Sequence, residues 1–209
     1  MTHLWEDQVL PRVLSLALST REVGRHRAEA TRGLAGTVLE IGFGSGLNLP
    51  HYPADVGEVL AVEPSDLGWK LSARRVGASA TPVRRVGLDG ADLPLPDATA
   101  DAALSTFTLC TLPDATTALH EVRRVLRPGG RLHFLEHGLA PEPAVAARQH
   151  RLNGMQRKLF GGCHLDRPID RLIEAAGFDV VELDRAFMKG PSVLQPWNFL
   201  YRGVATPAG

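Results

Sequence analysis

Apolar positions along this chain follow two alternating patterns. Continuous apolar runs, such as residues 38–41 and 59–62, fit buried strands that are covered on both faces. Between runs of this kind, residues 66–76 and 114–126 read as helices, with Asp66 and Asp114 as N-cap candidates. Further strand-like runs are residues 82–86, 102–107 and 131–136. This alternation predicts right-handed crossovers and a largely parallel sheet with helices on both faces.

Both ends of the chain add elements to this core. Residues 4–34 read as one amphipathic helix, and residues 167–176 as another. The arginines of the first helix, which are expected to be solvated, are Arg21, Arg25, Arg27 and Arg32. Residues 178–187 and 198–205 read as strands without a clear helix between them, which indicates an antiparallel hairpin. The predicted fold is a Rossmann-like, doubly wound α/β domain with a mostly parallel seven-stranded sheet.

The composition argues against several classes of protein but does not identify the function. With 209 residues the chain fits one domain, and its 23 basic and 23 acidic side chains give no global field to attract nucleic acid. No run of apolar residues is long enough to span a membrane, and no signal peptide is evident. Two cysteines, Cys110 and Cys163, are expected to be free thiols, so we expect a cytoplasmic protein.

The segment after the first predicted strand carries the strongest chemical signal. It reads V-L-E-I-G-F-G-S-G-L-N, with Glu40 near the end of the strand and Gly42, Gly44 and Gly46 at alternate positions. Without a Cβ atom, these glycines permit positive φ and a close approach of the backbone to a ligand. By itself the turn also fits a purely structural loop or a dinucleotide site.

Acidic residues follow the next two predicted strands. Glu63 ends the second strand, where a carboxylate can accept both hydrogen bonds of a ribose diol. Asp89 lies in the turn after the third strand, where its carboxylate can accept a hydrogen bond from an exocyclic amine. Together these acids suit an adenosine-containing ligand at the carboxyl edge of the sheet.

The four blocks E-x-G-x-G-x-G, V-E-P-S, G-x-D-G-A-D-L-P-L-P-D-A-T-A-D and R-R-V-L-R-P-G-G-R-L-H-F-L-E-H together resemble a class I S-adenosylmethionine methyltransferase of the type-11 group. They occur in that family's order and span about half of the chain. The resemblance implies S-adenosylmethionine as cofactor, with S-adenosylhomocysteine as product. The cofactor-binding positions that it implies are Glu40, Gly42, Gly44, Gly46, Asn48, Glu63, Pro64, Ser65, Leu88, Asp89, Gly90, Ser105 and Thr106.

The chain departs from the commonest family pattern directly after the glycines. Pro50 and Pro53 stand where a long helix usually begins, and proline interrupts a helix. This shortened helix, together with E-H-G at residues 136–138 and G-C-H-L-D-R at residues 162–167, resembles the alkyl-thiol S-methyltransferases and their bacterial relatives. The resemblance suggests a thiol acceptor. The membrane anchor of that group's animal members is not evident in this sequence.

Two segments are expected to form a lid over the site. Residues 1–36 precede the sheet as a helical lid, and residues 139–166 interrupt the methyltransferase domain, residues 37–209, as a second lid. In the second lid, Leu152, Met155, Leu159 and Phe160 recur at helical spacing and are expected to line the pocket or the core. Its basic residues fit a solvated helix face, or else recognition of an acidic substrate or lipid headgroup. These basic residues are Arg148, Arg151, Arg157 and Lys158.

Three residues are candidates for proton transfer from the acceptor. Histidine suits this work near neutral pH, and His137 follows the fifth strand at the expected ligand edge. His164 and Asp166 come second, although Asp166 also fits a helix cap, and His137 also fits a structural role. No third ligand accompanies His133 and His137, so no metal site is predicted.

Several functions remain open at this level. The leading hypothesis is methyl transfer to a small molecule, with thiol sulfur as the favoured acceptor. Methylation of carbon or nitrogen in a quinone-like or amine metabolite is the alternative within the family. A nicotinamide-dependent oxidoreductase and a non-catalytic cofactor-binding scaffold are the remaining readings. Neither the acceptor nor the oligomeric state follows from the sequence.

Overall fold

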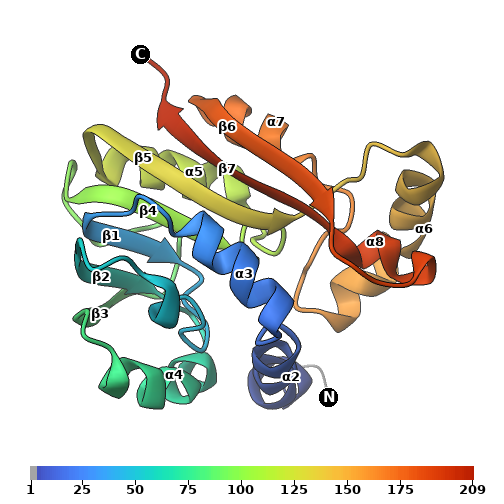
Figure 1. The fold of residues 1–209 in the computed structure, drawn as a ribbon, viewed down its shortest axis with the longest axis horizontal. Coiled ribbons are helices and arrows are strands. Elements are labelled where there is room, and N and C mark those ends of the chain that lie inside the picture. Colours follow the sequence, from blue (N-terminus) through green and yellow to red (C-terminus); the bar gives the residue numbers. More distant parts are fainter. Residues whose placement is uncertain (1–3) are drawn as a thin grey trace.

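The computed structural model describes residues 4–209 as a three-layer α/β arrangement (Figure 1). Its seven-stranded sheet has the order β3-β2-β1-β4-β5-β7-β6. The first five strands are parallel, whereas β7 runs antiparallel to both β5 and β6. The strands are β1 (Gly36–Ile41), β2 (Val56–Val62), β3 (Val83–Gly87), β4 (Ala100–Thr106), β5 (Leu126–His137), β6 (Phe178–Phe187) and β7 (Phe199–Pro207). The predicted Rossmann-like class and its C-terminal antiparallel hairpin are therefore confirmed.

Helices cover both faces of the sheet and extend past one of its edges. In Figure 1, α3 crosses in front of the sheet and α5 and α7 lie behind it, while α6 and α8 lie beyond the ends of β4 and β5. The α-helices are α2 (Leu10–Ala17), α3 (Arg21–Ala30), α4 (Asp66–Ala78), α5 (Ala115–Val125), α6 (Pro143–Leu159), α7 (Ile169–Ala175) and α8 (Gln195–Asn198). A π-helical turn η1 (Trp5–Val9) and the 3-10 turns η2 (Leu49–His51) and η3 (Ser192–Leu194) complete the set.

Two apolar layers hold these elements together. The larger joins the sheet to α5 and α7, where Leu119, Phe134 and Ile173 are completely buried. On the opposite face, Val38 and Leu104 pack with residues that flank the site. Burial of one such side chain stabilises the fold by about 1.5–3 kcal/mol. The sheet thus provides a rigid base for the loops that leave its carboxyl edge.

The predicted helix over residues 4–34 is wrong as a single element. Thr20 adopts an extended conformation and its side chain accepts a hydrogen bond from Val23 N, so it caps a new helix, α3. The chain therefore bends between α2 and α3. This bend brings α2 below the edge of the sheet, while α3 runs across its face (Figure 1).

Two predictions about individual side chains are also wrong. Ser65, and not Asp66, caps α4 by accepting a hydrogen bond from Gly68 N. Arg27 is buried rather than solvated, because its position on α3, between Val23 and Ala30, faces the protein. Asp114 does cap α5, as one of its carboxylate oxygens accepts from Thr117 N.

The lid helix α6 also differs from the expectation. Met155 and Leu159, predicted to line the pocket or the core, are largely exposed to solvent. The residues of α6 that are buried are instead Val145, Gln149 and Gln156. The polar Gln149 is satisfied inside the protein, because its amide donates to the carbonyls of Gly138 and Pro196 and accepts from Ala140 N.

Candidate functional site

The carboxyl ends of four parallel strands meet at one edge of the sheet. Ile41 pairs with Val62 of β2 and with Ser105 of β4, and Thr106 pairs with Leu135 of β5. The residues that follow these positions therefore share one edge. Ligands of open α/β sheets bind at this edge, outside the carboxyl ends of the strands.

The glycine-rich loop after β1 is built around a buried carboxylate. Gly42, Gly44 and Gly46 all have positive φ, a backbone conformation that residues with a side chain rarely adopt. Gly44 N donates to one oxygen of Glu63 at 2.5 Å, and Ser65 N donates to the other at 2.7 Å. Burial raises the pKa of Glu63. Glu63 thus lies where the loop after β1 and the start of α4 converge, the position at which a ribose would meet an acid.

A second buried carboxylate, Glu40, anchors a network below the loop. The amide of Asn48 donates to Glu40 at 2.7 Å, and the Tyr52 hydroxyl donates to the other oxygen. Glu40 is completely buried, and this burial raises its pKa to about 7 against the opposing hydrogen bonds from Tyr52 and Asn48 and the charge of Arg27. The network ties β1 to the proline-containing loop that replaces a long helix.

Arg27 of α3 closes this network from the other side. Its guanidinium donates to Asn48 Oδ1 at 2.7 Å and to Thr106 Oγ1 at 2.9 Å, and lies 5.2 Å from the centroid of the Phe107 ring. Burial lowers the pKa of Arg27 to about 10, which still leaves it charged at neutral pH. The Nε atom of Arg27 is buried without a partner. A cation contributed by the first lid therefore lies beside Glu40 and the end of β4.

The two candidates at the end of β4 face opposite sides of the sheet. Thr106 joins the Arg27 network, whereas Ser105 is completely buried and donates its hydroxyl proton to Glu136 at 2.7 Å. Glu136 also accepts from Thr108 N and Cys110 N. Of Ser105 and Thr106, one of which was expected to face the cofactor, only Thr106 lies on the side of Arg27, because neighbouring residues of a strand point to opposite faces. Ser105 instead holds the loop after β4 in place through Glu136.

The turn after β3 presents the residues expected at the adenine. Gly87 O accepts a hydrogen bond from Glu63 N at 3.1 Å, which keeps this turn next to the ribose-side acid. Leu88 is mostly exposed, although it is a large apolar residue. Asp89 accepts from Ala91 N at 2.9 Å and Gly90 is buried. The exposed Leu88 beside the exposed Asp89 offers an apolar surface on which an adenine ring can stack.

His137 lies at the end of β5, and only one of its two ring nitrogens makes a hydrogen bond. Its Nε2 is 3.0 Å from the carbonyl oxygen of Pro196, and this contact requires that Nε2 carry a proton. Its Nδ1 is buried and makes no well-formed hydrogen bond, although the Cys163 thiol lies near the His137 ring. With the proton on Nε2, Nδ1 keeps a lone pair inside the protein and at the ligand edge.

The two cysteines, 53 residues apart in sequence, lie together near His137. Cys163 Sγ is 3.9 Å from Cys110 Sγ, and His164 N donates to the Cys110 carbonyl. The contact with Cys110, and to a smaller extent His137, lowers the pKa of Cys163 below that of an ordinary thiol. The loop after β4 and residues 139–166 thus meet at a pair of free thiols, a proximity that the sequence did not indicate.

His164 and Asp166 belong to a different cluster from His137. Asp166 lies 3.1 Å from His150 Nδ1 and 3.8 Å from His164 Nδ1. Asp166 does not cap α7, since the N-cap position is Pro168. These contacts place Asp166 between α6 and its following loop, a position that favours a role in shaping the lid.

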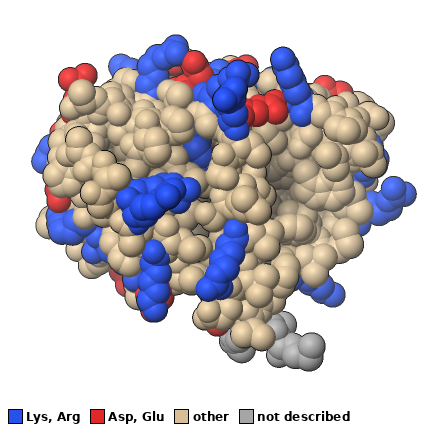
Figure 2. Space-filling view, turned by 60° about the horizontal axis from the view of Figure 1, so that its bottom comes forward, with Lys and Arg blue, Asp and Glu red and all other residues tan. Residues whose placement is uncertain are grey.

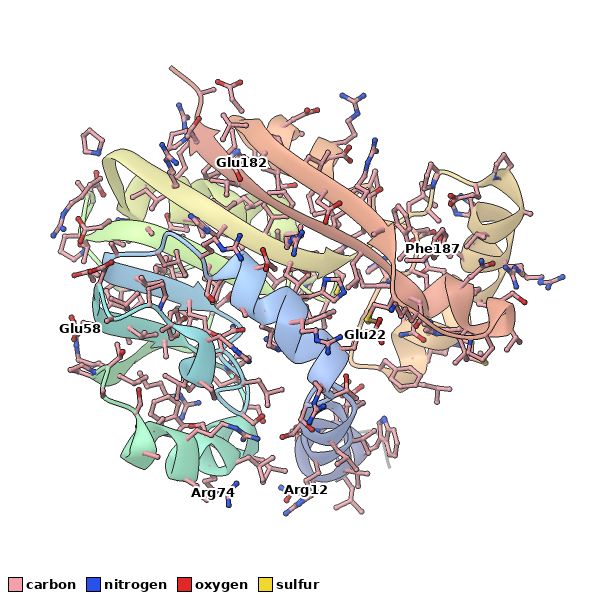
Figure 3. The ribbon with its side chains drawn as sticks, in the orientation of Figure 1. Arg12, Glu22, Glu58, Arg74, Glu182 and Phe187 are labelled. Atoms are coloured by element: carbon pink, nitrogen blue, oxygen red, sulfur yellow. The ribbon has the colours of Figure 1, made fainter. Side chains whose placement is uncertain are left out.

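Hydrogen bonds link the first expected lid to the glycine-rich loop and to the second expected lid. Ser15 of α2 is 2.8 Å from Ser45 of the glycine-rich loop, and the Trp5 indole donates to the Leu159 carbonyl at 2.8 Å. On the other side of α3, Glu22 points toward the turn after β6 and accepts from Lys189 N (Figure 3). Figure 2 shows a hollow on this side of the molecule, walled mainly by uncharged residues.

Sequence reasoning missed Arg27, Tyr52 and Glu136. The signal for Arg27 was its spacing from Val23 and Ala30, which places it on the inner side of α3. Glu136, an acid within an apolar strand, was visible as a residue that must find buried partners. Among residues 4–209, no group of three or more His, Cys, Asp or Glu side chains is arranged to hold a metal ion.

Comparisons with known proteins agree with the geometry of this edge. Residues 39–134 match the family described as "Methyltransferase domain". A thiol S-methyltransferase of Rattus norvegicus is 33% identical over 152 residues, which are 71% of this chain and 62% of the rat protein. The chain thus aligns with less than two-thirds of that relative. A phosphatidylethanolamine N-methyltransferase of Cereibacter sphaeroides is 30% identical over 76% of this chain and 77% of its own length.

Solved structures show the same fold. A Thermotoga maritima protein, described as an S-adenosylmethionine-dependent methyltransferase and possible histamine N-methyltransferase, has a TM-score of 0.69. Its sequence is only 20% identical, and the superposition covers 100% of both chains. The likeness therefore extends to the whole described fold, including the antiparallel C-terminal strands.

Proposed function

This chain belongs to the S-adenosylmethionine-dependent methyltransferase family, and we propose that it methylates a small-molecule thiol. The observation that carries the choice of chemistry is the unpartnered Nδ1 of His137 at the ligand edge. Similarity to a thiol S-methyltransferase supports the choice of acceptor. The acceptor and the roles given to the residues of the site are part of this proposal.

The residues at the edge fit the parts of this cofactor. Glu63 suits the two ribose hydroxyls, and the loop from Gly42 to Gly46 lets the backbone approach the methionine portion. Leu88 and Asp89 suit the adenine. When bound, the cofactor supplies a methyl group on a sulfonium, which is already an activated leaving group.

The work left to the protein is mainly positioning and removal of one proton. The Pro196 carbonyl fixes the tautomer of His137, so that Nδ1 is free to accept the proton of the acceptor S–H group. With that proton on His137, the thiolate sulfur would be held ready to accept the methyl group that the bound cofactor would supply, leaving S-adenosylhomocysteine. An acceptor held in line with the methyl group reacts as in an intramolecular reaction, and such positioning lowers the activation free energy by roughly several kcal/mol.

We also propose that the N-terminal helices and residues 139–166 act as the lid of this site. Two contacts support this role: Ser15–Ser45 links the N-terminal helices to the glycine-rich loop, and Trp5–Leu159 links them to residues 139–166. The second candidate, methylation of an amine nitrogen, is favoured by similarity to the phosphatidylethanolamine N-methyltransferase. An amine acceptor would need the same free base, His137 Nδ1.

The test is transfer of a labelled methyl group to a panel of thiols, amines, phenols and phospholipids. We expect product with thiols, identified by mass spectrometry as the methyl thioether. Product only with amines would replace the thiol assignment by the N-methyltransferase assignment. Tight binding of S-adenosylhomocysteine without product from any member of the panel would favour a cofactor-binding scaffold.

A further inference from the structure

An apolar stripe covers the outer side of the first lid. Val9, Val13 and Leu16 follow each other at helical spacing and are 38%, 40% and 77% exposed. The opposite side of α2 is fixed against the protein, where Leu10 is buried and Ser15 contacts Ser45. Solvent-facing positions of a helix are normally polar, so this helix presents its apolar side to the outside.

The stripe continues onto the second lid. Trp5, four residues before Val9, is partly exposed and donates its indole N–H to the Leu159 carbonyl. Leu159 is 46% exposed, and Met155, one turn earlier on α6, is 50% exposed. The exposed apolar residues of η1, α2 and the end of α6 therefore form one docking stripe, namely Trp5, Val9, Val13, Leu16, Met155 and Leu159.

Most charges next to the docking stripe are basic, although Glu6 and Asp7 of η1 lie between its Trp5 and Val9. Neither α2 nor α6 contains an acidic residue. Exposed basic side chains on these helices are Arg12, Arg151, Arg157 and Lys158. Figure 2 shows basic side chains spread over this side of the molecule, with acidic ones mostly near its margins.

An anionic lipid surface complements both features. Apolar side chains at the outer face of an interfacial helix enter the boundary between headgroups and acyl chains, and flanking basic residues are attracted to anionic headgroups. Tryptophan favours that boundary, because its ring is apolar and its N–H is polar. A second copy of this chain fits less well, since it would bring the same basic residues against one another.

We propose that α2 and the end of α6 dock this protein peripherally on an anionic lipid bilayer through the docking stripe. In residues 4–209, no helix is long and apolar enough to cross a membrane, so docking is confined to one surface. This proposal does not depend on the acceptor. Because Ser15 contacts the glycine-rich loop, the docked surface lies next to the cofactor edge.

Sedimentation with lipid vesicles tests the docking. The full chain is mixed with vesicles of phosphatidylcholine and phosphatidylglycerol in equal parts, or of phosphatidylcholine alone. We expect binding to the anionic vesicles that falls with added salt, and at least about tenfold weaker binding for the double variant Val13→Glu and Leu16→Glu. Binding of the unaltered chain to neither vesicle, or equal binding of this variant, would overturn the proposal.

A matched control separates the docking stripe from exposed apolar residues in general. Val181 and Leu183 of β6 are 55% and 40% exposed, so Val181→Glu with Leu183→Glu adds the same charge at a distant surface. We expect this control to bind vesicles like the unaltered chain. Circular dichroism checks that both variants are folded. Sedimentation velocity tests whether a second copy occupies the stripe instead. A dimer of the unaltered chain that the double variant Val13→Glu and Leu16→Glu dissociates would overturn the proposed docking on a bilayer.

Discussion

At the scale of single residues, burial sets the charge states around the site. Glu40 is completely enclosed, and this raises its pKa to about 7, even though Asn48, Tyr52 and Arg27 all favour its charged form. The sequence identified Glu40 as a site residue, but its burial and partners depend on segments far away in the chain. Arg27 and Tyr52 reach Glu40 only because α3 and the proline-containing loop fold against β1.

The raised pKa of Glu40 predicts how stability depends on pH. In the unfolded chain the carboxyl ionises near its usual value of 4.5, whereas in the folded protein it keeps its proton until about pH 7. The contribution of Glu40 to stability is therefore greatest below pH 4.5 and is lost as pH rises to about 7. The shift corresponds to roughly 3 kcal/mol.

The variant Glu40→Gln removes this titration. Denaturant unfolding at a series of pH values should show its stability rising relative to the unaltered protein, by about 2–3 kcal/mol, between pH 4.5 and pH 7.5. Asp101→Asn is a control outside the site, because hydrogen bonds to Thr37 N and Arg127 lower the pKa of that carboxyl. A constant difference between Glu40→Gln and the unaltered protein over this range would show that Glu40 is charged throughout.

His137 is the residue on which the proposed proton transfer depends. Removing a general base typically slows a reaction by about 10² to 10⁴-fold, so His137→Ala should lower kcat/KM for a thiol by a factor in this range. The affinity for S-adenosylhomocysteine should stay unchanged. The loss should shrink for thiols of low pKa, since these ionise without help.

The exposed His120 of α5 provides the control for His137. His120→Ala should turn over the thiol at the normal rate, because α5 lies behind the sheet (Figure 1). His164→Ala examines the second candidate, whose contact with Asp166 ties it to the lid loop. Unchanged turnover of His137→Ala, or an equal loss for thiols of every pKa, would remove His137 from the role of base.

At the scale of elements, local signals predicted most of the sheet and failed where tertiary contacts decide. β6 has the bounds that its apolar pattern predicted, and α5 begins after Asp114 as expected. The helix over residues 4–34 failed because Thr20 offers a cap that competes with continuation of the helix. The outward side of α6 was predicted as inward, because spacing shows which residues share a face but not where that face points.

The glycines after β1 show the same limit, since their spacing does not reveal their surroundings. A Cβ atom at Gly42 would collide with the side chain of Thr108, whereas a Cβ atom at Gly44 would meet only Gly42 O at 3.9 Å. Both glycines have positive φ, at 73° and 57°. Gly44→Ala therefore carries the backbone penalty alone, and Gly42→Ala carries an additional steric penalty.

We expect Gly44→Ala to lower the free energy of unfolding by about 1–2 kcal/mol, and Gly42→Ala to lower it by clearly more. Urea unfolding at constant pH gives both values. Gly77 serves as a control, since it lies in α4 with open space around it and an ordinary φ. Gly77→Ala should be neutral or stabilising. Equal losses for Gly42→Ala and Gly44→Ala would contradict the close approach of Thr108 to the glycine-rich loop.

At the scale of the whole molecule, two segments outside the sheet meet above its carboxyl edge. The N-terminal helices supply Arg27 to the inner network and Ser15 to the glycine-rich loop. Residues 139–166 supply Cys163, which lies against Cys110 of the loop after β4. The alternation of strands and helices predicted the sheet, but only the structure shows that these two segments converge on one edge.

The most direct measurement is a crystal structure of the protein with S-adenosylhomocysteine bound. We expect both ribose hydroxyls on Glu63, the adenine beside Leu88 and Asp89, and the sulfur atom turned toward His137 Nδ1. Electron density for the ligand elsewhere, or a sulfur atom turned away from His137 with the ribose apart from Glu63, would contradict the proposed site.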